Sequence, residues 1–200
     1  MPTMVELPRI PEPALPRRKV WTRDEVLALE GSGILDHQHL ELVQGELIDK
    51  MPETRPHSIG LKVLYQWLMQ TFGAAFVEQE VPIDVAPNDN ATNEPEPDII
   101  VLKREFSSFT SANPGPEDLR LAVEIAYSTI DFDLSTKAAL YARAEIPEYW
   151  VLDVIGRRLL VHRDPRDGKY GSVVAFGEHE SVAPLAAPEQ AFRVRDAFPV

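Results

Sequence analysis

The sequence of 200 residues contains no cysteine and has few basic side chains for its size. The absence of cysteine excludes a disulfide scaffold and a zinc site with thiolate ligands, and it fits a reducing compartment, so we expect a cytoplasmic protein. Lysine and arginine together number 20, against 32 aspartates and glutamates, which gives a formal net charge of −12. This balance argues against a large nonspecific nucleic-acid surface, because such surfaces neutralise phosphates with lysine and arginine.

Long apolar runs are also missing from the sequence. None approaches the roughly 18 residues of a membrane-spanning helix, and the N-terminus lacks the basic and apolar regions of a secretory signal, so we expect no membrane contact. Five prolines fall within the first 19 residues. Proline at that density prevents helix and interrupts strand pairing. We therefore predict a loosely docked arm over residues 1–19 and a single domain over residues 20–200.

The remaining pattern predicts a mixed α/β fold with a central sheet. A capping box at Thr22 predicts a short helix that stops at Gly31, and Gln44-Gly45 predicts a β-hairpin. Helical spacing of apolar residues runs from Pro56 to Phe72. We predict further strands at 75–86, 99–102, 119–126, 148–154, 157–162 and 170–176, and a helix over 134–145 with Asp133 as its N-cap.

Three charged residues occupy positions where burial is expected. Asp98 precedes one apolar run, and Glu124 lies within another, on the strand face that carries small alanines. Lys137 falls on the apolar stripe of the helix predicted after that strand. Ionised groups in such places are costly unless they are compensated, and a bound cation would compensate them. The pattern therefore predicts a divalent-metal site for phosphodiester hydrolysis.

Two alternatives involve the same residues without a metal. Lys137 could extend its ammonium to solvent along an apolar surface, or it could form a buried ion pair with Glu124. The ion pair needs only these two residues, whereas a metal site also needs Asp98 nearby. For His57, a capping or solvent-facing position is the simplest interpretation of its place in the first turn of a helix.

An ordered set of short motifs resembles the Uma-two family of restriction endonucleases over roughly residues 41–170. The motifs are Pro97-Asp98, Glu124-Ile125-Ala126, Asp133 with Lys137, Tyr141-Ala142 and Ile146-Pro147-Glu148-Tyr149-Trp150. That family resembles the wider PD-(D/E)XK nuclease superfamily. The resemblance implies a restriction-endonuclease-like fold, in which a central mixed sheet is flanked by helices.

The resemblance also implies roles for individual residues. Asp98 and Glu124 correspond to the metal-binding acidic pair, and Lys137 takes the place of a strand lysine because the expected position holds Ala126. Glu41 and His57 match family positions as secondary candidates. The cofactor is then Mg²⁺ or Mn²⁺, which prefers oxygen ligands and could also use the main-chain carbonyl of Ile125.

The family resemblance implies a nucleic-acid substrate, most simply DNA. A homodimer is the default expectation, because symmetric pairs are the commonest oligomers and cutting both strands needs two sites. The rival hypothesis is a catalytically silent nuclease-like fold that acts as a binding or regulatory module. The net charge of −12 favours that rival, whereas the complete Asp, Glu and Lys set favours the enzyme.

Overall fold

The computed structural model describes residues 18–36, 38–50 and 54–198, so residues 1–17 of the predicted arm lie outside the described residues. Its centre is a six-stranded sheet in the order β3-β4-β5-β6-β7-β8. Neighbouring strands are antiparallel except β5 and β6, which are parallel. The predicted mixed α/β class with a central sheet is confirmed. The strands are β3 (Val77–Gln79), β4 (Ile99–Leu102), β5 (Leu119–Ala126), β6 (Glu148–Asp153), β7 (Arg158–Arg166) and β8 (Lys169–Gly177).

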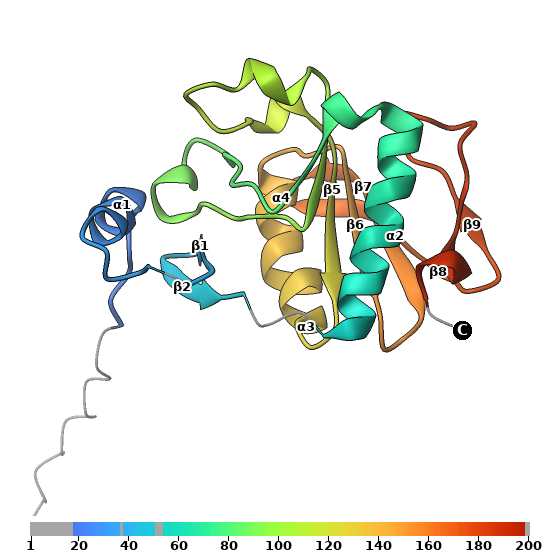
Figure 1. Ribbon diagram of the computed structural model, residues 1–200, viewed down its shortest axis with the longest axis horizontal. Coiled ribbons are helices and arrows are strands. Elements are labelled where there is room, and N and C mark those ends of the chain that lie inside the picture. The colour runs from blue at the N-terminus through green and yellow to red at the C-terminus, as the bar shows by residue number, and fades with distance from the viewer. Residues whose placement is uncertain (1–17, 37, 51–53, 199–200) are drawn as a thin grey trace, which may run out of the picture.

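Helices cover both faces of this sheet (Figure 1). One face packs against α2 (Arg55–Phe72), with Val123 and Ile125 of β5 in the shared core. The other face, which carries Ala122 and Ala126, packs against the continuous helical segment formed by α3 (Ile130–Phe132), η5 (Asp133–Lys137) and α4 (Ala138–Arg143). The central strands are rich in apolar residues, as expected for strands that are buried on both faces.

The chain begins with α1 (Arg23–Gly31) and a hairpin of β1 (Leu40–Val43) and β2 (Glu46–Asp49). The predicted capping box at Thr22 and the hairpin turn at Gly45, with a φ of 74°, are both present. The hairpin is not isolated, because Leu42 pairs with Glu94 just before β4. This contact places β1 next to the start of the central sheet.

Two predicted elements were wrong in detail. The strand expected over 75–86 is only β3, which follows the short helical turn η1 (Ala74–Phe76). It ends because Glu80 has a φ of 50° and a proline follows at 82. The helix expected over 134–145 begins earlier, with Thr129 at the N-cap position, so Asp133 lies inside the helical segment and is not its cap.

The smaller elements complete the ends of the sheet. They are the two-stranded ribbon of β9 (Ser181–Val182) and β10 (Phe192–Arg193), and the turns η2 (Asn90–Thr92), η3 (Phe106–Ser108), η4 (Pro116–Asp118) and η6 (Val194–Ala197). Within the described ranges, no helix is both long enough and apolar enough to traverse a bilayer.

Candidate functional site

Strand pairing brings Asp98 and Glu124 together. In the antiparallel ladder of β4 and β5, Ile99 is opposite Val123, so the residue just before β4 lies beside the next residue of β5. The backbone N–H of Ile125 donates to Oδ2 of Asp98 at 2.6 Å. β4 begins at Ile99, so the strand pairing does not include Asp98. The Asp98 carboxylate accepts the hydrogen bond of the Ile125 N–H, which a main-chain carbonyl would accept in a longer ladder.

Lys137 reaches the same place from the helical segment that packs on the sheet face of Ala122, Glu124 and Ala126. Its Nζ lies 2.8 Å from Oε1 of Glu124 and 2.9 Å from Oε1 of Glu41, and its side chain is only 3% exposed. The ammonium is therefore buried, and the alternative in which it extends to solvent is wrong. Lys137 ends η5, a π-helical turn in which the N–H of Ala138 bonds to the carbonyl of Asp133. Such turns occur often at functional sites because they change the direction of side chains.

Glu41 and Glu124 are each held by a second hydrogen bond. Tyr141 Oη donates to Oε1 of Glu124 at 3.0 Å, and the backbone N–H of Glu96 donates to Oε2 of Glu41 at 3.1 Å. Oε1 of Glu124 thus receives both Lys137 and Tyr141. Among the described residues, none donates to Oε2 of Glu124, so this oxygen is available to another partner.

Tyr141 was given no role from the sequence alone. It occurs in one of the family motifs, and it lies four residues after Lys137 on a helix, a spacing that puts two side chains on one face. That spacing was the available signal for its place in the site. Its ring also packs edge-on against Tyr149, whose Oη donates to the carbonyl of Asp133.

His57 approaches Asp98 from the first turn of α2. Its Nε2 lies 3.7 Å from Oδ2 of Asp98, and its backbone N–H donates to the N-cap side chain of Thr54. The imidazole is therefore turned toward the acidic residues, and the simple capping or solvent-facing interpretation does not describe it. The five residues named from the sequence form two contacting sets, Glu41 and Glu124 with Lys137, and His57 with Asp98. The sets adjoin, because Asp98 accepts from the backbone N–H next to Glu124 and the charge of Lys137 lowers its pKa.

This group contains more negative than positive charge. Four buried carboxylates, from Glu41, Asp98, Glu124 and Asp133, interact electrostatically with the ammonium of Lys137, the one lysine buried among the described residues. Burial lowers the pKa of Lys137, but the carboxylates of Glu124, Glu41 and Asp133 outweigh it and hold that pKa above the usual value, so the lysine stays protonated. Lysine in this position is a cation and not a base.

The carboxylates respond differently to their surroundings. Burial raises the pKa of Glu124 well above its usual range, Lys137 opposes that rise, and the charge of Asp98 adds to it. Burial likewise raises the pKa of Asp133 to about 6, again against the opposing effect of Lys137. Burial also opposes ionisation of Asp98, but His57, Lys50 and Lys137 together lower its pKa. An added cation would relieve the cost of ionising Glu124.

The oxygen donors suit a hard cation with an incomplete protein shell. Within the described ranges, no group of three or more histidine, aspartate or glutamate side chains is arranged as a metal-ligand set. Two carboxylates, Asp98 and Glu124, are sufficient for Mg²⁺, which keeps several of its waters. The N–H of Ile125 points to Asp98, and in a strand the carbonyl of a residue points to the same edge as its N–H. The Ile125 carbonyl therefore faces the same side and could complete the set.

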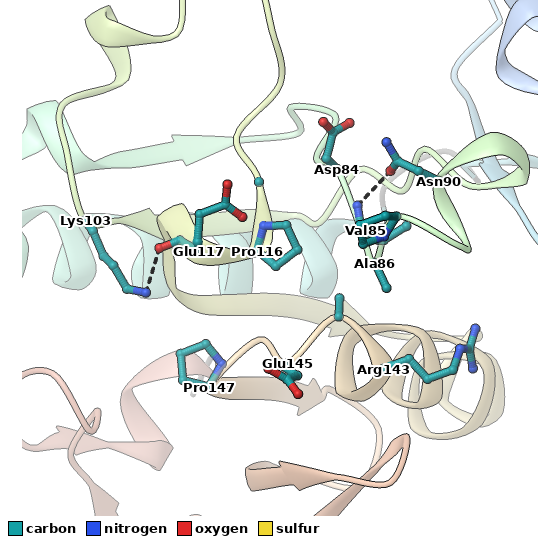
Figure 2. Close-up of a pocket in the computed structure, with 13 residues that line it drawn as sticks. Asp84, Val85, Ala86, Asn90, Lys103, Pro116, Glu117, Arg143, Glu145 and Pro147 are labelled. Carbon is teal, nitrogen blue, oxygen red and sulfur yellow. Dashed lines mark hydrogen bonds between the residues drawn. The ribbon is translucent and has the colours of Figure 1, made fainter.

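A pocket of about 670 Å³ lies at the opposite end of β5 from these residues (Figure 2). Its walls include Lys103, Glu117, Arg143 and Pro147, which flank the N-terminal ends of β5 and β6 and the C-terminal end of α4. Glu124 is five residues along β5 from Leu119, a separation of about 16 Å in a strand. The pocket and the acidic cluster are therefore separate features.

Comparisons with known proteins give a family and a fold. The Uma2 family, described as "Putative restriction endonuclease", matches residues 23–195. A crystal structure from Anabaena variabilis, described as a "putative nuclease belonging to DUF820", is similar with a TM-score of 0.59 and 15% sequence identity. The similarity covers 80% of this chain and 89% of that one. A comparison with curated proteins gives no match.

Proposed function

We propose, from the premise that this chain belongs to the Uma2 family of restriction-endonuclease-like proteins, that it is a metal-dependent endonuclease acting on phosphodiester bonds in DNA. One observation carries the proposal: Asp98, Glu124 and Lys137 converge in a buried cluster with surplus negative charge. An ion pair alone would need only Glu124 and Lys137. The position of Asp98 beside them is what the metal hypothesis requires and the ion-pair hypothesis does not.

Each residue then has a task that follows from its contacts. Asp98 and Glu124 would hold Mg²⁺ or Mn²⁺, with the Ile125 carbonyl as a third ligand; the ion supplies neutralisation of phosphate charge and a more acidic bound water. Lys137, which stays protonated, would orient the attacking water and stabilise negative charge on the phosphate.

Glu41, His57 and Tyr141 would support these tasks. Glu41 fixes the Lys137 ammonium through a second ion pair beside that with Glu124. Tyr141 fixes Oε1 of Glu124, which leaves Oε2 for the cation. His57, beside Asp98 and only partly buried, lies where a phosphate could approach the cluster. It would contribute positive charge there when protonated.

A second candidate is a nuclease-like fold retained as a binding or regulatory module. The net charge of −12 supports it, because DNA binding uses basic surfaces. The same charge is only a partial obstacle to catalysis, since some of it belongs to the four carboxylates of the cluster, which a bound cation would partly neutralise.

Cleavage assays separate the two candidates. The full chain would be incubated with supercoiled and single-stranded DNA and Mg²⁺ or Mn²⁺, beside Asp98→Asn and Lys137→Met. The matched control is Glu148→Gln, which alters an equally buried carboxylate that bonds Arg163 and Trp150 outside the cluster. We expect cleavage by the wild type and the control and none by the two site variants. Equal cleavage by all four proteins, or no cleavage by the wild type, contradicts the nuclease proposal.

Thermal melting with Mn²⁺ tests the cation site without relying on activity. Binding to the folded state at about 100 times Kd adds about 2.7 kcal/mol of stability. We expect a rise in melting temperature for the wild type and a much smaller one for Asp98→Asn. A wild type that Mn²⁺ stabilises but that cuts no DNA would support the silent module.

A further inference from the structure

The outer edge of the central sheet is formed by β8, and this edge has no strand beside it among the described residues. Residues 169–176 make no backbone hydrogen bond in the described chain other than those with β7. An edge strand exposes a row of N–H and C=O groups that can pair with another strand. The opposite edge, β3, is only three residues long and offers much less of this surface.

Apart from Lys169 at its start, the sequence of β8 lacks the features that usually protect an edge. Residues 171–177, Gly-Ser-Val-Val-Ala-Phe-Gly, contain no charged residue and no proline. Val173 and Val174 are 53% and 47% exposed. Natural edge strands usually carry lysine, proline or a bulge at such positions to prevent pairing. An exposed strand of this composition is suited to pairing with another strand.

We propose that β8 pairs antiparallel with β8 of a second copy of this chain, so that two six-stranded sheets join across a twofold axis. An antiparallel pair related by such an axis requires one residue to lie opposite its own copy. We assign this position to Val173, the most exposed large apolar residue of the strand.

Charge and size both agree with this register. With Val173 on the axis, Ser172 lies opposite Val174 of the partner subunit and Gly171 opposite Ala175 of the partner subunit. Lys169, the only charged residue of the strand, lies opposite Gly177 of the partner subunit, so no two like charges meet across the new ladder. A chain with a net charge of −12 can therefore associate through this edge without facing its own acidic residues there.

A neighbouring apolar pocket supports the same axis. It has a volume of about 350 Å³ and is lined by Ala138, Ala139, Leu160, Tyr170 and Val173 among others. Val173 is paired with His162 of β7, which also lines this pocket. In directly opposed pairs the Cβ atoms lie about 4.5–5.5 Å apart on the same face of the sheet. Val173 of the partner subunit would therefore sit at the mouth of the pocket.

The N-terminal arm is a poorer occupant for this edge. All five prolines of residues 1–17 lack the N–H that a ladder needs, and the longest proline-free stretch between them, residues 3–7, spans only five residues. A second β8 supplies nine residues without proline, so every residue that faces the free edge keeps both its N–H donor and its C=O acceptor. The symmetric pair is thus the occupant that the chemistry of the edge favours.

Light scattering coupled to gel filtration tests the proposal with the full chain. We expect the wild type at twice its mass of 22.5 kDa, and Val173→Lys at the mass of one chain, because two lysines would face each other on the axis. The matched control is Ile155→Lys, at an even more exposed apolar residue in the turn between β6 and β7, which should remain a dimer. A monomeric wild type at the highest soluble concentration, or a dimer that Val173→Lys leaves intact, overturns the proposal.

Engineered cysteines give a readout that does not depend on how well the lysine variant folds. Because the sequence has no cysteine, Val173→Cys introduces a single thiol per chain. Mild oxidation should convert it to a covalent dimer, while Ile155→Cys under the same conditions should not cross-link. Equal cross-linking of the two variants would show that random encounters, and not this register, bring the thiols together.

Discussion

The replacement of Lys137 by methionine is the sharpest test of the acidic cluster. The ammonium lies 2.8 Å from Glu124 and 2.9 Å from Glu41, and each attraction is worth about 6 kcal/mol at an effective dielectric constant of about 20. Desolvation of the buried groups cancels much of this sum. Removing only the cation leaves the carboxylates buried and uncompensated, which typically costs about 3–5 kcal/mol. We therefore expect Lys137→Met to lower the free energy of unfolding by that amount.

Chemical denaturation and thermal melting at neutral pH would measure the loss. In a domain of this size each 1 kcal/mol lowers the melting temperature by about 2–4 °C, so a drop of about 10 °C is expected. Lys62→Met is the matched control, because Lys62 lies on the exposed side of α2 and its loss should change stability by less than about 0.5 kcal/mol. The deficit of Lys137→Met should shrink at acidic pH, because burial raises the pKa of Glu124 and its carboxyl is then neutral. Equal stability of the two variants would refute the electrostatic reasoning.

Three further predictions concern neighbouring residues. Burial raises the pKa of Asp133 from 3.8 to about 6, so between these two pH values the folded state holds a proton that the unfolded state releases. The free energy of unfolding therefore falls by about 3 kcal/mol as the pH rises from 3.8 to about 6. Asp133→Asn should therefore gain stability relative to the wild type between pH 4 and pH 7, as followed by melting curves; a constant difference would count against the assignment. Tyr141→Phe should cost about 1–2 kcal/mol and weaken Mn²⁺-induced stabilisation, because it removes one of the two donors that fix Oε1 of Glu124. Unaltered Mn²⁺ titrations would argue against this role. Gly60→Ala should lower the free energy of unfolding, measured by urea denaturation, by about 1–3 kcal/mol, since its Cβ would lie 2.9 Å from Cδ2 of Leu152. Adding Leu152→Val should recover part of this loss. A Gly60→Ala variant of unchanged stability would mean that α2 can shift away from the sheet.

Local chemistry made much of the fold predictable. Thr22 with Glu25, the turn at Gly45 and the apolar run of β5 each specify their element through near neighbours, and all three occur where expected. The helix that carries Lys137 was harder, because a π-helical turn depends on tertiary contacts. Its early start at Ile130 is not signalled by any cap, since the Thr129 hydroxyl instead donates to Asp133. The strand expected over 75–86 failed because alternation of polar and apolar residues persists beyond the backbone turn at Glu80.

In the candidate site, likewise, features set by local sequence were predictable, whereas contacts between distant segments were not. The sequence places Asp98, Glu124 and Lys137 at a strand start, in a strand and on an apolar helical stripe, and these placements agree with the structure. It could not supply the bond from Lys137 to Glu41, which spans 96 positions of the chain and depends on how the hairpin docks. The role of Tyr141 depends likewise on which oxygen of Glu124 its hydroxyl reaches, which spacing alone cannot determine.

The docking of that hairpin has a consequence for local unfolding. Glu41 is held between the β1–β2 ladder and the segment before β4, through its pairing with Ile48 and its bond to the N–H of Glu96. Any opening that releases the hairpin also removes one of the two carboxylates that hold Lys137. The amide hydrogens of the hairpin and the integrity of the cluster should then share one opening free energy. A cation that stabilises the cluster should slow hydrogen exchange in β1, although none of the proposed ligands belongs to that strand.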